Sequence, residues 1–388
     1  MVVAGGFAQR LFGGGHSVHA FATDPARGVF ILGFLVVVIG GSLLLFAWRA
    51  PQVGAGGTFE PVSRESMLLA NNVLLLVATA AVLLGTLYPL VLDALGMGKI
   101  SVGPPYFEAV FVPLVAPALF LMGVGPLARW RQASAIDLAR RLRWAFAVSA
   151  LAALLAPLAL GTWTPWVSFG LLLATWIASS SVVNLWARLR AHPAPSVWSR
   201  LAAQPSSYYG MLLAHCGMAV FIVGVTLVKG YEIEKDVRMQ VGDSATIGTY
   251  TFRFDSVKEL RGPNYTGAHA TLTVTQDGKH VATMEPEKRL YTATRTPMTE
   301  AAIATGFTRD LYVSVGEPLP DGAWAVRLHV KPFVDWIWAG CVLMALGGFL
   351  AVCDRRYRAS RVRDTAEAPR SAPATPPLKP LLNKARAR

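Results

Sequence analysis

Seven apolar runs, each near the length of a bilayer crossing, constrain this chain more than any other feature of its sequence. A transmembrane helix needs about 20 consecutive, mainly apolar residues. Runs of this kind lie at 29–48, 67–92, 106–127, 144–163, 166–186, 209–228 and 333–352. Aromatic side chains stand at many of their ends, as they do at membrane–water interfaces. The pattern predicts a polytopic α-helical membrane protein with about seven transmembrane helices.

The composition favours the same class. Only 15% of the residues are charged, against about 25% in soluble domains, which excludes an ordinary soluble enzyme. A formal net charge of +13 suggests nucleic-acid binding in a soluble protein, but in a membrane protein it usually reports cytoplasmic loops. These Arg-rich loops lack interleaved aromatic residues that face water, so we predict no nucleic-acid partner.

The distribution of basic residues predicts how the chain crosses the membrane. Lys and Arg are concentrated in four segments, 49–66, 128–143, 187–208 and 353–388. These segments carry 20 Lys and Arg, whereas the short segments on the other side carry 3. Because basic loops stay in the cytoplasm, we expect a periplasmic amino-terminal segment at 1–28 and a basic, disordered cytoplasmic tail at 354–388. We also expect a six-helix membrane region at 29–228 and a last transmembrane helix at 332–353.

The segment 229–331 differs from the rest of the chain. It holds 13 basic and 13 acidic residues, and a near-neutral segment of this length crosses a membrane largely regardless of charge. Apolar residues alternate through 249–257, and two later alternating runs are each interrupted by a turn dipeptide, Asp277-Gly278 and Asp321-Gly322. This pattern is typical of β-hairpins. We predict a small all-β periplasmic domain, a barrel or a sandwich, inserted before the last helix.

An ionisable residue inside a membrane span indicates a functional site, and His215 is the clearest case. It lies six residues into the run 209–228. Its neighbours Gly210, Ala214 and Gly217 are small, which lets either a partner helix or a flat macrocycle approach the backbone. Imidazole is a common axial ligand of haem iron, so His215 is a candidate metal ligand. The alternative is a neutral His that hydrogen-bonds across a helix interface.

His19 lies just before the first apolar run. It could ligate a metal or haem at the outer interface, or it could be a solvated loop residue. His16, three positions earlier, adds only a second ligand, which is weak evidence for a metal site. Nucleotide-binding, zinc-protease and serine-hydrolase motifs are absent, so no catalytic residue is assigned. The remaining His residues share no spacing and receive no role: His192, His269, His280 and His329.

Several short motifs occur in an order that resembles a known family. The first part of the chain carries Ser17-Val18-His19-Ala20-Phe21-Ala22, Arg64-Glu65, Gly85-Thr86-Leu87-Tyr88-Pro89, Ser101-Val102-Gly103-Pro104-Pro105-Tyr106-Phe107 and Ala214-His215. The β region carries Gly262-Pro263-Asn264-Tyr265, Pro286-Glu287-Lys288-Arg289-Leu290-Tyr291 and Leu311-Tyr312-Val313 through Gly316-Glu317. This ordered set resembles the carboxy-terminal part of the cytochrome c maturation haem lyase subunit family, CcmF and its relative NrfE.

The resemblance implies a multi-pass subunit of the bacterial inner membrane that acts in cytochrome c biogenesis. Members of the family take haem from a haem chaperone and attach it covalently to apocytochrome c, together with other cytochrome c maturation subunits. In this resemblance His19 matches an external His that holds the incoming haem. His215 matches an intramembrane axial ligand of a resident haem b. Both residues would bind metal through the haem iron.

The sequence also departs from the family. The Trp-rich segment that handles haem is absent, and so are the partner external His and the partner intramembrane His. We therefore expect a half-protein that is truncated, frameshifted or split, and that needs an amino-terminal haem lyase half for activity. Two other functions stay open: a non-catalytic assembly scaffold and a haem transporter. The absence of a clear inverted repeat argues against the transporter.

Overall fold

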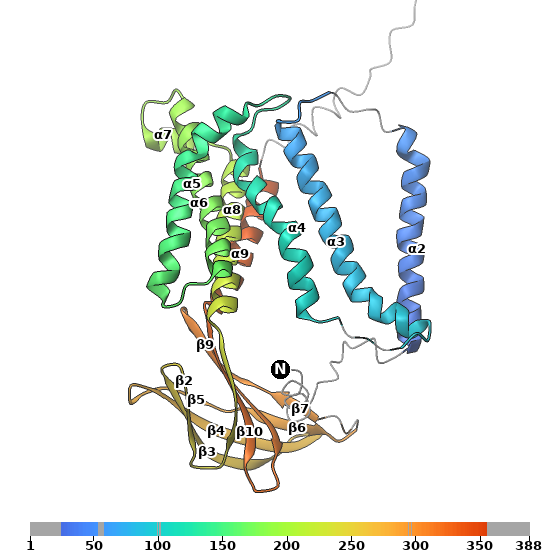
Figure 1. Ribbon diagram of the computed structural model, residues 1–388, viewed down its shortest axis with the longest axis vertical. Helices are drawn as coiled ribbons and strands as arrows, with labels where there is room; N and C mark the ends of the chain where they lie inside the picture. The colour runs from blue at the N-terminus through green and yellow to red at the C-terminus, as the bar shows by residue number, and fades with distance from the viewer. Residues whose placement is uncertain are drawn as a thin grey trace, which may run out of the picture.

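The structure is a computed structural model that describes residues 25–52, 58–98, 100, 102–293, 295 and 297–354 of the chain. Seven of the helices in this part are long and apolar enough to cross a membrane. A β-sandwich lies beyond one end of the helices (Figure 1). The predicted fold class, a polytopic helical membrane protein with an inserted β domain, is confirmed. The end of the bundle next to the sandwich is called the β side below, and the opposite end is called the distal side.

The long helices follow the predicted apolar runs. They are α2 (Pro25–Arg49), α3 (Arg64–Ala94), α4 (Pro104–Val124), α5 (Ala135–Leu160), α6 (Pro165–Ala191), α8 (Ser206–Tyr231) and α9 (Val334–Val352). Three short helical segments lie on the distal side: η2 (Ala50–Gln52), η3 (Gly125–Leu127) and α7 (Val197–Ala202). Ser63 caps the start of α3 and Thr164 caps α6, because each side chain accepts a hydrogen bond from a backbone N–H of the first turn.

Helix α5 departs from its predicted bounds of 144–163. It begins nine residues earlier, where the Ser134 side chain accepts a hydrogen bond from Asp137 N at 3.3 Å. One turn later, Arg141 Nε lies 3.0 Å from Asp137 Oδ2. Gly161, with a φ of 114°, ends the helix. Polar residues therefore extend α5 beyond the apolar run, which hydropathy alone does not detect.

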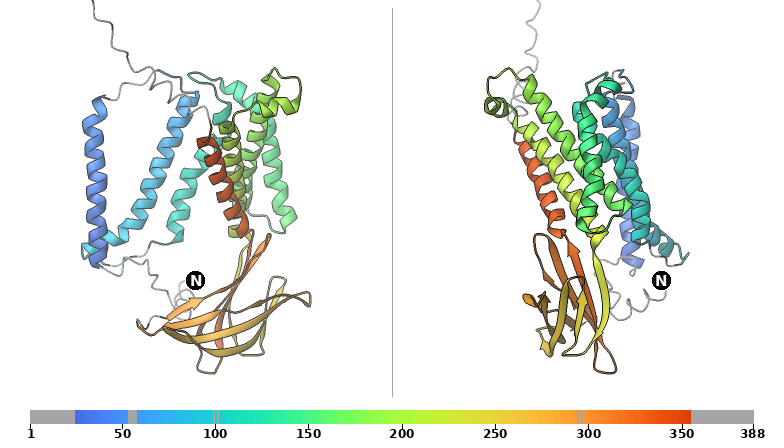
Figure 2. Two further views of the ribbon diagram at one scale, coloured as in Figure 1. Left: turned by 180° about the vertical axis from the view of Figure 1, so that it is seen from behind. Right: turned by 60° about the vertical axis from the view of Figure 1, so that its left-hand side comes forward.

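The helices form a packed group with α2 at its edge. Helices α8 and α9 make the most extensive pair, α6 packs against α4, α5 and α8, and α3 packs against α4. Helix α2 stands apart and touches α3 only near the β side (Figures 1 and 2). No residue in its most apolar stretch is buried. The core of the helical part thus lies around α6 and α8.

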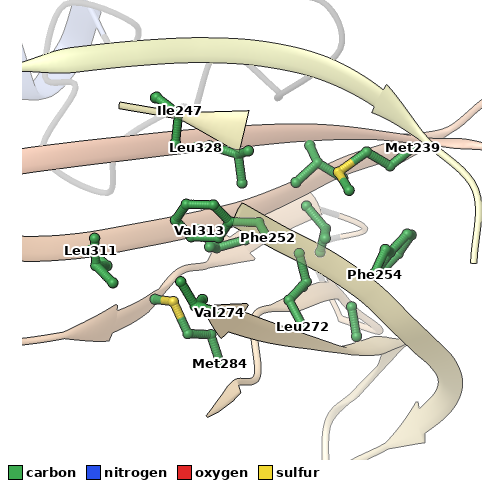
Figure 3. Close-up of a cluster of buried hydrophobic side chains, with 13 residues drawn as sticks. Met239, Ile247, Phe252, Phe254, Leu272, Val274, Met284, Leu311, Val313 and Leu328 are labelled. Atoms are coloured by element: carbon green, nitrogen blue, oxygen red, sulfur yellow. The ribbon is translucent and has the colours of Figure 1, made fainter. Parts of the chain in front are cut away.

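The β domain consists of two antiparallel sheets. One contains β1 (Ile233–Met239), β10 (Trp324–Pro332), β9 (Arg309–Pro318) and β8 (Ala302–Ala304), in that order. The other contains β2 (Ser244–Ile247), β3 (Tyr250–Arg261), β4 (Tyr265–Gln276), β6 (Glu287–Tyr291) and β7 (Pro297–Glu300), with β5 (Lys279–Met284) also paired to β4. Apolar side chains from both sheets fill the space between them; Phe252, Leu272 and Leu328 are fully buried (Figure 3).

Both predicted hairpins are present. Strands β4 and β5 are joined at Asp277 and Gly278, whose φ angles of 49° and 75° match the left-handed turn that favours Asp-Gly. Strands β9 and β10 are joined by the loop containing Gly322, with a φ of 80°. Strand β1 follows α8 and pairs with β10, which precedes α9. The sandwich is thus fixed to the α8–α9 pair by two adjacent strands.

Candidate functional site

Helix α8 places His215 near the middle of a membrane span. Pro205 precedes the helix in an extended conformation, and Asp354, just after α9, accepts a hydrogen bond from Ser207 N at 2.9 Å. A carboxylate at a helix amino terminus satisfies a free N–H and favours the helix dipole. His215 is nine residues from the first residue of α8, or about 14 Å along its axis.

The small residues beside His215 contact α9. A Cβ atom at Gly217 would lie 2.8 Å from the carbonyl oxygen of Gly340, and the backbone of Gly347 approaches both Gly210 and Ala214 equally closely. The suggestion that Gly210, Ala214 and Gly217 leave space for a macrocycle is therefore wrong within this chain. A partner helix, α9, occupies this face instead, because Gly lets two helix backbones meet where no side chain intervenes.

The imidazole of His215 lies in a cleft between α4 and α6. Its lining is formed by Met122, Gly123, Pro126, Ser180, Ser181, Asn184, Met211, Leu212 and His215 itself. The side chain is half-buried, and Nδ1 lies 2.8 Å from the carbonyl oxygen of Met211, one turn earlier in α8. A carbonyl can only accept, so Nδ1 carries the proton and donates. In the tautomer that this bond selects, Nε2 carries the lone pair that a metal would need. The ring also has a hydrogen-bonding interaction with the backbone of Met122 in α4, across the helix interface.

Polar groups of α6 line the cleft opposite His215, and the sequence analysis missed them. Asn184 is buried, and its Oδ1 accepts a hydrogen bond from the Tyr208 hydroxyl at 2.8 Å. Ser180 and Ser181 donate to the carbonyl oxygen of Ile177 at 3.1 and 2.7 Å. The signal was present in the sequence, because Ser and Asn interrupt the apolar run of α6 and polar residues at membrane depth mark functional or packing sites.

The other His candidates lie elsewhere. His19 and His16 are outside the described residues. His192 ends α6 on the distal side, where its Nδ1 accepts a hydrogen bond from Ala194 N at 3.2 Å. Within the described ranges, no three His, Cys, Asp or Glu side chains group closely enough to hold a metal ion. His215 is thus the candidate metal ligand that the structure describes inside the membrane.

The surroundings of His215 can be compared with those of histidines that bind metals. Histidines that bind metals usually donate their second ring N–H to a carbonyl or carboxylate, and the bond from His215 Nδ1 to Met211 meets this requirement. The cleft has a volume of about 0 Å³ for a water-sized molecule, far below the roughly 300–1,000 Å³ of small-molecule pockets. The described residues around His215 therefore do not enclose a macrocycle, and this chain could supply one axial ligand at most.

Motifs quoted for the family resemblance form structural contacts. Gly85 of α3 faces the ring of Tyr106 at the start of α4, and the Tyr106 hydroxyl donates to the Ala81 carbonyl at 2.9 Å. Glu65 of α3 accepts a hydrogen bond from Arg131 N at 2.8 Å. In the sandwich, the ring of Tyr265 packs edge-on against Tyr291 at 5.8 Å. These motifs therefore join successive elements of the fold.

Comparisons with known proteins agree with this arrangement. A family model described as the CcmF C-terminal beta-sandwich matches residues 230–332. The cytochrome c-type biogenesis protein CcmF of Pseudomonas aeruginosa is 49% identical over 351 residues, covering 90% of this chain and 53% of that protein. CcmF of Escherichia coli K12 is 48% identical, covering 91% and 53%. NrfE of Haemophilus influenzae is 34% identical, covering 88% and 52%.

A solved structure of the cytochrome c haem lyase CcmF is also similar. Its TM-score to this chain is 0.65 at 25% sequence identity, and the match covers 84% of this chain and 50% of that one. The chain thus spans about half the length of the relatives it matches. The resemblance predicted from the sequence motifs is confirmed, and the chain belongs to the CcmF/NrfE family of cytochrome c-type biogenesis proteins.

Proposed function

We propose that this chain forms the haem-binding carboxy-terminal portion of a membrane haem lyase that attaches haem to apocytochrome c. The observation that carries the proposal is the position of His215 within a span, where Nδ1 lies 2.8 Å from the Met211 carbonyl oxygen and Nε2 is the ring nitrogen that would bind a metal. A resident haem b would supply a redox-active iron at this position. The role of this chain is to hold and orient the imidazole from α8.

We further propose that the protein lies in a bacterial inner membrane with its β side in the periplasm. The short segments on the distal side, with Arg49, Arg129 and Arg188 among their basic residues, are richer in Lys and Arg than the short segments on the β side, and basic loops stay in the cytoplasm. With this orientation the carboxy terminus is cytoplasmic. His19 then precedes α2 on the periplasmic side, where it is proposed to hold incoming haem.

The proposed function requires several partners. A second imidazole for the resident haem has to come from outside the described residues, because α8 carries the one His that they place within a membrane span. We assign it to the portion of the family protein that this chain does not span. The proposed partners on the periplasmic side are a haem chaperone, apocytochrome c and other cytochrome c maturation subunits.

A non-catalytic assembly scaffold is the second candidate function. The small cleft at His215 favours it, because this chain alone does not enclose a macrocycle. The two functions differ in what His215 does. A lyase component loses b-type haem absorbance when His215 is replaced, whereas a scaffold does not.

The proposal is tested in cells that lack their own family member, with this chain co-expressed with the remaining portion of the family protein. His19→Ala is expected to lower holocytochrome c by at least about tenfold, the loss typical of altering a metal site. The b-type absorbance of the purified complex should persist in this variant. His280→Ala, which changes an exposed His of the sandwich, is the matched control. Unchanged maturation in His19→Ala would refute the role of His19.

A further inference from the structure

A cavity lies on the distal side, where the span that contains α4 ends, away from His215. It has a volume of about 370 Å³ and is lined by Leu127, Arg129, Gln132, Ala133, Ser134, Asp137 and Leu138. Leu127 is the last residue of the span that begins at Pro104. The volume is within the usual range for small-molecule sites. The lining combines apolar side chains with polar ones, as expected at a lipid–water interface.

The loop that lines the cavity is held in place by the loop before α3. Glu60 N donates to the Arg131 carbonyl at 2.9 Å, Arg64 N to Arg129 at 3.0 Å, and Ala133 N to Val62 at 2.7 Å. The Glu65 carboxylate also accepts a bond from Arg131 N. Arg131 adopts a left-handed φ of 63°, a conformation that non-Gly residues adopt where surrounding contacts or function require it. The cavity is therefore built on a fixed pair of loops.

Arg129 lines the cavity, and Arg131 and Arg64 lie on the two loops that carry it. Arg129 and Arg131 form no ion pair with any residue that the structure describes. The Arg64 guanidinium lies 4.9 Å from the centre of the Trp130 ring, whose residue is 59% exposed. The one carboxylate in the lining, Asp137, is paired with Arg141. Guanidinium groups that form no ion pair can donate hydrogen bonds to the oxygens of a phosphate.

We propose that this cavity binds the headgroup of an anionic phospholipid. Basic pockets between transmembrane helices at the cytoplasmic surface bind such headgroups. Arg129, in the lining, would donate hydrogen bonds to the phosphate, and Arg131 on the same loop would add positive charge. Leu127 and Leu138 supply the apolar part of the lining. Trp130, an exposed aromatic residue beside it, occupies the level of the headgroups. The amino terminus of α5 adds a positive dipole end at the same position.

The test measures lipid retention on the full chain purified in detergent. Native mass spectrometry compares phosphatidylglycerol with phosphatidylcholine of the same acyl chains. We expect phosphatidylglycerol to bind at least about tenfold more tightly, and the double variant Arg129→Gln/Arg131→Gln to lose this preference. The double variant Arg140→Gln/Arg143→Gln is the matched control, because it removes the same charge from α5 outside the cavity and should keep the preference.

One further variant and one competition experiment complete the test. Gln132→Trp fills the cavity without changing the charge and should also abolish the preference, which covers the case in which the Arg129→Gln/Arg131→Gln variant fails to fold. Glycerol phosphate added without lipid should not compete at concentrations near those of the lipid. Equal losses in the two double variants, full binding in Gln132→Trp, or equal competition by glycerol phosphate would each overturn the proposal.

Discussion

The backbones of Gly210 in α8 and Gly347 in α9 lie in direct contact: a Cβ atom at Gly347 would be 2.6 Å from the carbonyl oxygen of Gly210. The same close approach recurs one heptad further on, between Gly217 and Gly340. Small residues at this spacing let membrane helices pack backbone to backbone. This contact holds the face of α8 opposite His215 against α9, so that the imidazole is directed toward α4 and α6.

Gly347→Val is expected to weaken the α8–α9 pair, because the added side chain has no space and the helices must separate. Overpacking of this kind costs about 1–3 kcal/mol. Gly348→Val is a matched control on the next residue, where a Cβ atom would meet nothing within 4 Å. Unfolding of the two variants in mixed detergent micelles measures the difference. Equal stability of the two would show that the contact is not tight.

The sandwich is expected to lose stability as the pH falls below about 6.5, because of His329. This residue is only 9% exposed, its ring packs edge-on against Tyr312, and its Nδ1 lies 3.8 Å from Glu234 Oε2. Burial lowers the pKa of His329 below its ordinary value of 6.5, despite the opposing effect of Glu234. The unfolded chain therefore binds the proton at a higher pH than the folded chain does, and acid favours unfolding.

Hydrogen exchange of the β9 and β10 amides between pH 7 and pH 5, corrected for the intrinsic exchange rate, measures this effect. His329→Leu should make the stability of the two strands less dependent on pH, whereas His280→Leu, at an exposed position, should not. An unchanged pH dependence in His329→Leu would show that another group is responsible.

The proposed orientation of the chain predicts the outcome of reporter fusions. A fusion at Asp277, in the β4–β5 turn, should report a periplasmic location, and a fusion at Ala194, after α6, should report a cytoplasmic one. The reason is the excess of Lys and Arg in the distal segments. A cytoplasmic signal at Asp277 would reverse the orientation and with it the proposed position of His19.

The sequence predicted the elements of the fold better than their contacts. Runs of apolar residues and the Asp277-Gly278 turn are local signals, and each produced the expected helix or hairpin. The first turns of α5 were missed because Ser134 and Asp137 start the helix through polar contacts. Hydropathy does not register such contacts, so the predicted span began nine residues late.

In the candidate site, too, the sequence predicted the element but not its contacts. The position of His215 in a span was evident from the sequence, but the role of Gly210 and Gly217 was not, because their partner α9 lies more than a hundred residues later in the chain. The cleft likewise depends on Asn184 and Met122 from two other helices. Such non-local contacts have no signature in one sequence.

The central claim is that His215 is an axial ligand of a resident haem. The most direct test is the absorbance spectrum of this chain, purified together with the remaining portion of the family protein. The account predicts a bis-imidazole b-type spectrum for the complex, little haem on this chain alone, and no such spectrum in His215→Ala. His192→Ala, which changes the distal end of α6, should leave the spectrum intact. A full bis-imidazole spectrum in His215→Ala would contradict the account.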